Sequence, residues 1–129
     1  KKYFAGIFTI TLLLFSLTGQ AQKAADDAIS PADLAARIAA DDAPLVLDVR
    51  TENEFSAGHI PGAINIPHLE LQARIDELAG HENDTIVLHC RSGRRAIPAG
   101  EVLRRSGFTR VIELDGHMLG WEAGGHPTE

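Results

Sequence analysis

The chain has 129 residues and an excess of acidic side chains, with a formal charge of −6 at pH 7, and it contains no repeat or low-complexity segment. This charge makes nucleic acids and anionic membrane surfaces poor partners. A single cysteine excludes an internal disulfide, so the thiol needs another explanation.

The first 21 residues have the pattern of an export signal. Two lysines precede an apolar run from Tyr3 to Leu17, and Gly19 and Ala21 are small residues at positions that a signal peptidase would read. The run is shorter than the ~20 residues that span a bilayer. We therefore expect residues 1–21 to be a cleaved signal peptide, which predicts a periplasmic or secreted protein with no stable membrane association after processing. An uncleaved membrane anchor is the alternative.

A single domain is expected after the signal. Residues 22–27 are polar and lack periodicity, which predicts a flexible lead-in to a domain over residues 28–129. A short strand at 28–30 would open this domain. A helix over residues 31–40 should follow, because Ser30 is a good N-terminal cap and a proline occupies the first turn.

Strands and helices then alternate along the chain. Residues 44–49 are continuously apolar up to an acid, as in a strand that is covered on both faces of a parallel sheet. Further strands are expected at 63–66, 85–89 and 110–114, and helices at 52–58, 68–78 and 95–105. The alternation predicts an α/β fold in which a mostly parallel sheet of about five strands is flanked by helices on both faces.

The only cysteine, Cys90, directly follows the strand expected at 85–89, at the edge of the sheet where ligands bind in such folds. The next residues must turn the chain into a helix, so free backbone N–H groups would face the sulfur. These groups, the helix dipole and nearby arginines lower the pKa of a thiol from ~8.5 and favour the nucleophilic thiolate. A buried cysteine acting as a small apolar side chain is the alternative.

The neighbourhood of this cysteine is basic although the domain is acidic. Five arginines lie between Arg91 and Arg105, with Glu101 as the only acid among them, which suits a small anionic ligand better than a polyanion. Tyrosine-type phosphatases and related arsenate reductases have five residues between the cysteine and a closing arginine. Here only four residues separate Cys90 from Arg95. The loop is therefore one residue short for phosphate and suits a sulfane sulfur or a persulfide.

Two segments resemble the motifs of rhodanese domains: LVLDVRTENEFSAGHIPGAINIP at residues 45–67 and CRSGRRA at residues 90–96. The second is similar to the six-residue active loop of single-domain sulfurtransferases, in particular small periplasmic thiosulfate sulfurtransferases. The resemblance covers nearly all of the domain and implies a three-layer rhodanese-like α/β fold. It also implies that Cys90 takes a sulfane sulfur from thiosulfate, holds it as a persulfide and passes it to a thiophilic acceptor.

The resemblance implies roles for the loop residues. Cys90 would be the nucleophile, and the loop backbone would stabilise the thiolate and the persulfide. This backbone belongs to Arg91, Ser92, Gly93, Arg94 and Arg95. The three arginines are candidates to hold the sulfonate end of thiosulfate, although not all can point inward. Arg95 matches the loop-closing arginine, whereas Arg94 occupies a variable position.

Residues outside the loop would support the site. Asp48 is expected to hydrogen-bond the base of the loop, or alternatively to cap a helix or turn. Arg50 is expected to pair with Glu54, four residues on. His89 alternates away from Cys90 along its strand, so we interpret it as a packed core histidine rather than a general base. His117 stands where relatives usually place a second glycine, near the mouth of the site, which leaves the acceptor preference open.

The resemblance implies no cofactor. One cysteine suffices, because the intermediate is a persulfide and needs no resolving thiol. The six histidines form no helical His-x-x-x-His pair, so no metal site is indicated. The implied partners are a small anionic sulfur donor such as thiosulfate, and cyanide or a thiol as acceptor, for example a thioredoxin-like protein. The alternatives are a non-catalytic rhodanese-like sulfur carrier or binding module, and a cysteine-dependent phosphatase or arsenate reductase.

Overall fold

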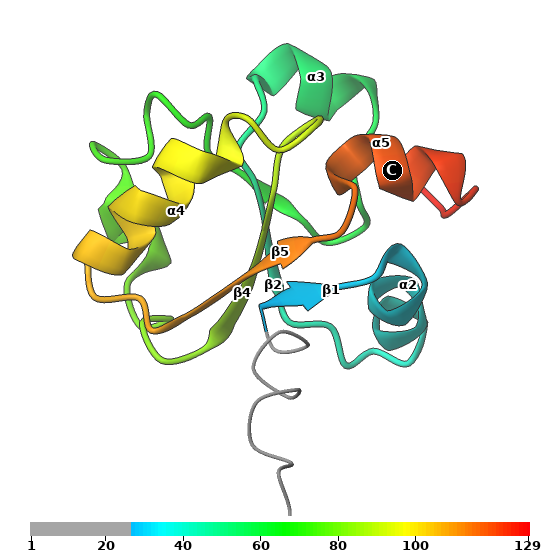
Figure 1. Cartoon of the computed structure of the whole chain (residues 1–129), viewed down its shortest axis with the longest axis horizontal. Helices are drawn as coiled ribbons and strands as arrows, with labels where there is room; N and C mark the ends of the chain where they lie inside the picture. The colour runs from blue at the N-terminus through cyan, green and yellow to red at the C-terminus, as the bar shows by residue number, and fades with distance from the viewer. Residues whose placement is uncertain (1–26) are drawn as a thin grey trace, which may run out of the picture.

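The computed structural model describes residues 27–129, and Figure 1 shows their arrangement. The signal peptide expected at 1–21 lies outside the described residues, as does the lead-in expected at 22–27 except for its last residue. That residue, Asp27, accepts a backbone hydrogen bond from Glu113 at 3.0 Å, so it is already held against the sheet. Within residues 27–129, no helix has the length and hydropathy needed to cross a bilayer.

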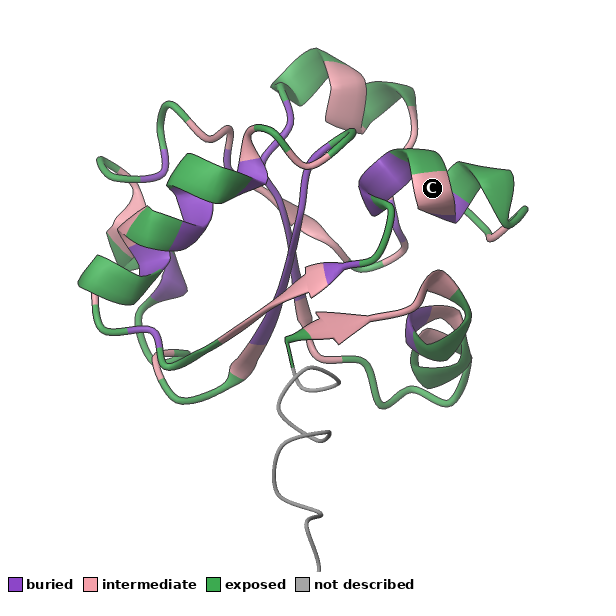
Figure 2. Ribbon diagram, in the orientation of Figure 1, coloured by how far each residue is buried: buried purple, intermediate pink, exposed green. Residues whose placement is uncertain are grey.

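Five parallel strands form one sheet in the order β1-β5-β4-β2-β3, as the α/β prediction required. They are β1 (Ala28–Ile29), β2 (Leu45–Asp48), β3 (Ile64–Asn65), β4 (Thr85–His89) and β5 (Arg110–Leu114). The middle strand β4 is buried on both faces from its second residue to its last, as the burial colours of Figure 2 show. This position explains its continuous apolar run and directs its carboxyl end toward the edge where ligands bind.

Helices cover both faces of the sheet and complete three layers (Figure 1). They are α2 (Pro31–Ala39), α3 (Glu52–Ala57), α4 (Ala96–Arg105), α5 (His117–Ala123) and the 3₁₀ helix η1 (Ile75–Leu78). One apolar cluster joins β4 to α4 and η1 through Leu78 and Leu103. A second joins the other face to α2 and α5 through Leu34 and Trp121. The two cores clamp the sheet, so the ends of its strands hold fixed positions.

The prediction of a helix over residues 68–78 is wrong. This segment consists of turns followed only by η1, with i→i+3 bonds such as the one from Glu77 to the carbonyl of Arg74 at 3.0 Å. Leu69, which counted toward the helical pattern, is 85% exposed. An apolar face that is not buried contributes little to a short helix, and successive turns suffice to bury the remaining leucines. The other expected elements form within one or two residues of their predicted ends.

Candidate active site

The active loop, residues 90–95, runs from the carboxyl end of β4 to the first residue of α4. The backbone N–H of Gly93 donates to Sγ of Cys90 at 3.0 Å. Gly93 has a φ of +113°, a conformation that side-chain-bearing residues rarely adopt. A Cβ at this position would also lie 3.0 Å from Nε2 of His117. The loop therefore needs glycine both to curl around the sulfur and to leave space for this histidine.

The sulfur of Cys90 lies in an environment that favours the thiolate. Burial raises the pKa of the Cys90 thiol, but the His117 ring and the N–H groups of Ala96, Gly93 and Arg95 outweigh it and bring the pKa to about 6. The N–H groups of Arg95 and Ala96 lie at the start of α4, where a helix leaves its N–H groups without internal partners. At neutral pH the thiolate is therefore the main form, and the thiolate is the nucleophile.

The loop side chains divide into two groups. Arg91, Ser92 and Arg94 are exposed at the mouth of the site. Arg95 is partly buried and binds Glu54 of α3, with Nη1 to Oε1 at 2.6 Å and Nη2 to Oε2 at 3.0 Å. The Arg95 side chain thus ties the end of the loop to α3, while the backbone of the loop faces the sulfur.

The expected pair of Arg50 with Glu54 is wrong. Arg50 instead binds Asp48, with Nη2 at 2.7 Å from Oδ2 and Nε at 3.0 Å from both carboxylate oxygens. Arg50 precedes the helix that Thr51 caps, so the i,i+4 geometry of a helix does not apply to it. The expected bond from Asp48 to the loop base is also wrong, because its carboxylate accepts from Arg50. The pair is buried beside the active strand, with Asp48 0% and Arg50 5% exposed.

His89 is packed in the interior, where its ring is fully buried. Its Nδ1 lies 3.2 Å from the carbonyl oxygen of Cys90, and its Nε2 lies 3.7 Å from Oδ2 of Asp48. No residue in the range 27–129 hydrogen-bonds this Nε2. Burial lowers the pKa of His89 and favours the neutral ring. These contacts agree with a packed core histidine that links β2 to β4.

The sequence placed His117 near the mouth of the site but did not predict its bond to Cys90. It begins α5 with a φ of +54°, and its Nδ1 accepts the backbone N–H of Cys90 at 3.2 Å. The next two residues of α5 donate to the loop as well: Met118 to the carbonyl of Cys90 at 3.0 Å, and Leu119 to that of Arg91 at 3.1 Å. The departure from glycine, in a segment expected to border the mouth of the site, was the available signal, and it did not indicate which loop atoms α5 would contact.

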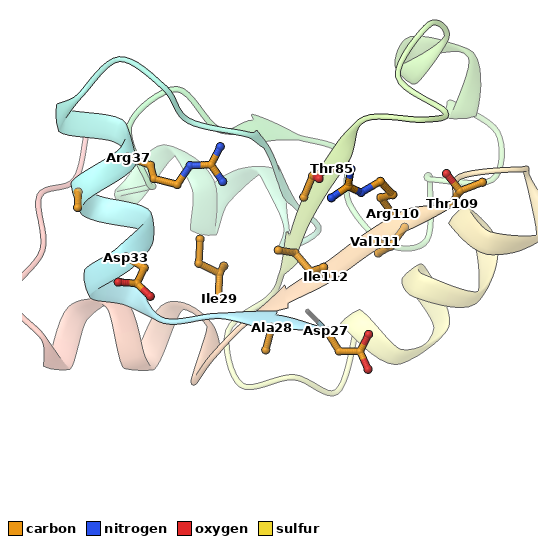
Figure 3. Close-up of a pocket in the computed structure, with 11 residues that line it drawn as sticks. Asp27, Ala28, Ile29, Asp33, Arg37, Thr85, Thr109, Arg110, Val111 and Ile112 are labelled. Carbon is orange, nitrogen blue, oxygen red and sulfur yellow. The ribbon is translucent and has the colours of Figure 1, made fainter. Parts of the chain in front are cut away.

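A hollow of about 780 Å³ lies far from this chemistry. Figure 3 shows that Thr85 and Arg110 line it, and these residues begin β4 and β5. Cys90 lies beyond the opposite end of β4. A smaller hollow of about 210 Å³ adjoins the loop and is lined in part by Arg91, Glu54 and Glu122. Between residues 27 and 129, no group of three or more His, Cys, Asp or Glu side chains could hold a metal ion.

The rhodanese-like domain family matches residues 30–124, which include the whole sheet except β1 and the complete active loop. The chain belongs to this family. The rhodanese domain is 43% identical over 106 residues to an HTH-type transcriptional regulator of Mycobacterium tuberculosis, covering 81% of this chain. It is 38% identical over 93 residues to thiosulfate sulfurtransferase 16, chloroplastic, of Arabidopsis thaliana, covering 64% of this chain and 78% of the plant protein.

Solved structures show the same fold for the rhodanese domain. A rhodanese-related protein from Thermoplasma volcanium is 31% identical with a TM-score of 0.67, covering 79% of this chain and 96% of the other. The chain spans only 45% of the length of the mycobacterial regulator. It is also 38% identical over 85 residues to a putative sulfur carrier protein of Bacillus subtilis, covering 66% of this chain and 45% of that protein. The family thus includes both sulfurtransferases and larger proteins that contain a rhodanese domain.

Proposed function

We propose that this rhodanese domain is a thiosulfate sulfurtransferase. The observation that carries the proposal is the thiolate of Cys90 at the base of a loop with four residues before its closing arginine, where backbone N–H groups converge on the sulfur. A relative named as a thiosulfate sulfurtransferase supports the choice of donor. The loop length also argues against a phosphatase or arsenate reductase.

The proposed reaction has two displacements. The Cys90 thiolate attacks the outer sulfur of thiosulfate, an S–S bond to Cys90 forms, and the S–S bond of thiosulfate breaks as its electron pair leaves with sulfite. The Cys90 persulfide anion remains. A thiophilic acceptor then attacks the outer sulfur of this persulfide: cyanide leaves as thiocyanate, or a thiolate leaves as a persulfide, and the Cys90 thiolate is restored. Neither half-reaction requires a metal, a redox partner or a net proton.

The loop would recognise the dianionic donor by charge and by its backbone. The N–H groups that lower the pKa of Cys90 would stabilise the persulfide anion in the same positions. Arg91 and Arg94 are exposed at the mouth and are free to meet the sulfonate oxygens. Arg95 is bound to Glu54, so it would attract the donor while it remains in this ion pair.

Intact-mass measurement tests the proposal directly. Treatment with thiosulfate should add one sulfur atom to the wild-type chain and none to Cys90→Ser, and cyanide should remove it. Steady-state assays should give thiocyanate with ping-pong kinetics, negligible aryl phosphate hydrolysis, and no transfer by Cys90→Ser. Full transfer activity in that variant, or preferred hydrolysis of aryl phosphate, would exclude the assignment.

A sulfur carrier is the second candidate, because the putative sulfur carrier protein of Bacillus subtilis is a relative. A carrier would accept one sulfur atom on Cys90 but release it to cyanide much more slowly than to a protein thiol, for example that of a thioredoxin-like protein. The rate of the second displacement with each acceptor, measured on preformed persulfide, separates the two functions.

We also propose that the protein acts outside the cytoplasm, because residues 1–21 have the pattern of a signal peptide. Fractionation of expressing cells should then recover a shortened soluble form from the periplasm or the medium. A full-length form retained in the membrane would contradict this proposal.

A further inference from the structure

His117 hydrogen-bonds the backbone of Cys90, a contact that the proposed reaction does not use. Its Nδ1 accepts the backbone N–H of Cys90 at 3.2 Å, and the edge of its ring lies against Gly93. We propose that His117 is a positioning residue for the active loop, which holds the Cys90 backbone in place and balances the negative charge of its sulfur. The role of this residue in sulfur transfer rests on the proposed function, whereas its role toward the thiolate does not.

The backbone at His117 is held in a costly conformation. Its φ of +54° lies in the left-handed region, which non-glycine residues enter at a cost. Such strain persists only where the surroundings fix it, and it is concentrated at functional sites. Here the bonds from Met118 and Leu119 to the loop carbonyls hold the turn of α5 in place. The strained turn therefore directs the imidazole toward the loop. A glycine would adopt the same turn without strain but would have no side chain to contact the loop.

The ring spans two residues of the loop from a position that is only 8% exposed. Because Nδ1 accepts a hydrogen bond, the proton of the neutral ring lies on Nε2, the nitrogen that would lie 3.0 Å from a Cβ at Gly93. The same Gly93 donates its N–H to the sulfur at 3.0 Å. A displacement of the ring would therefore disturb both the Cys90 backbone and the neighbouring N–H donor.

The groups around His117 favour its protonation. A hydrogen bond to the Cys90 sulfur raises the pKa of His117, burial opposes this, and the charges of Cys90, Glu113 and Asp115 raise it further. His89, whose charge would act on His117, is kept mainly neutral by its own burial. In its imidazolium form His117 can no longer accept at Nδ1, but both ring nitrogens can donate and the ring carries a positive charge beside the sulfur anion. One side chain thus serves as backbone acceptor or as counter-charge, according to its protonation.

Two substitutions separate these contributions. His117→Asn retains an amide oxygen near the place of Nδ1 and tolerates the left-handed conformation, but it cannot carry a charge. His117→Gly relieves the backbone strain and removes both interactions. Exposed His81, which lies ahead of β4 and binds Asp84 at 2.9 Å, provides the control His81→Asn. The readouts are the pH dependence of Cys90 alkylation by iodoacetamide and kcat/KM for thiosulfate.

Both His117 variants should raise the pH midpoint of Cys90 alkylation by about one unit. Below the midpoint, the thiolate fraction should then be roughly tenfold smaller than in the wild type. Above the midpoint, His117→Gly should lose about tenfold in kcat/KM, and His117→Asn should recover most of that loss. His81→Asn should match wild type in both measurements. Unchanged midpoints in both variants would overturn the charge role, and equal kcat/KM for His117→Gly and wild type would overturn the positioning role. Shifted midpoints in a protein that transfers no sulfur from thiosulfate would support the role toward the thiolate and reject the proposed function.

Discussion

The carboxylate of Glu54 joins the closing residue of the active loop to the start of a helix. It binds the guanidinium of Arg95 through two contacts, at 2.6 and 3.0 Å. The same carboxylate accepts the backbone N–H of Thr51 at 3.2 Å and completes the capping box of α3. Glu54 and Arg95 are 41 positions apart in the sequence, one in each rhodanese motif. Their ion pair therefore holds the two motifs together at the site.

Arg95→Ala should impair the reaction more than Arg104→Ala. Loss of Arg95 removes a charge-assisted contact of ~1.5 to 3 kcal/mol and releases the loop from α3, so kcat/KM for thiosulfate should fall roughly ten- to hundredfold. Arg104 lies nine residues along α4, about 13 Å from Arg95 at 1.5 Å per residue. This distance exceeds the ~8 Å physiological screening length, so loss of the Arg104 charge should have little effect on kcat/KM. Equal small losses in steady-state kinetics would mean that the basic cluster only solvates the surface.

The ion pair between Glu54 and Arg95 should make stability depend on pH in the acid range. The hydrogen bond from Arg95 is the main cause that lowers the pKa of Glu54 from 4.5 to about 2. A depressed folded-state pKa gives a stabilisation that is complete above the unfolded-state pKa and is lost as the pH falls through the folded-state value. Glu54→Gln should therefore lower Tm near neutral pH, and the difference from wild type should shrink between about pH 4.5 and about 2. A Tm difference that stays constant over this range would contradict the assignment.

Asp48→Asn should strongly destabilise the fold. The substitution leaves Arg50 as a buried charge without its carboxylate, a loss of about 3 to 5 kcal/mol in the free energy of unfolding by urea denaturation. Asp42→Asn is the matched control, because its pair with Arg37 spans 4.0 Å between largely exposed side chains. The control should leave the unfolding midpoint almost unchanged. A loss in Asp48→Asn no larger than that in the control would show that the buried pair contributes little.

Gly93→Ala should reduce sulfur transfer by more than tenfold through the geometry of the loop. The new Cβ would meet the His117 ring, and the positive φ would be strained, so the Gly93 N–H would turn away from the Cys90 sulfur. Gly80→Ala provides the control, because Gly80 has a similar φ of +92° but nothing within 4 Å of its added Cβ. Both variants should lose stability in thermal unfolding, Gly93→Ala at least as much as Gly80→Ala, and only Gly93→Ala should lose activity. Equal activity in the two would contradict the role of the loop geometry.

Local patterns in the sequence predicted most of the fold. The apolar run of β4, the caps of α2 and α3, and the position of Cys90 after its strand follow from short-range chemistry. The alternating elements could therefore be anticipated as a mostly parallel sheet, although the order of its strands could not. The rhodanese motifs supplied the loop and its residues. The failure at residues 68–78 shows the limit of this approach, because only tertiary packing decides whether a short amphipathic segment completes a helix.

The contacts that complete the site could not be predicted in this way. Arg50 was expected to bind a residue at helical spacing, but it precedes the helix and binds back to Asp48. The bond from Cys90 to His117 joins residues 27 positions apart, and no periodicity encodes such a separation. These partners are set by which strand ends meet at one edge of the sheet. A sequence alone gives the types of residue that reach this edge, not the pairs that they form.

The only tryptophan of the chain lies on the helix that contacts the active loop. Trp121 is fully buried, and its indole Nε1 donates to the carbonyl of Pro127 at 2.9 Å. It follows His117 by one turn of α5, so a shift of this helix on sulfur loading would change the surroundings of the indole ring. The protein thus contains its own fluorophore one helical turn from His117, and stopped-flow emission could follow each half of the proposed sulfur transfer without a label.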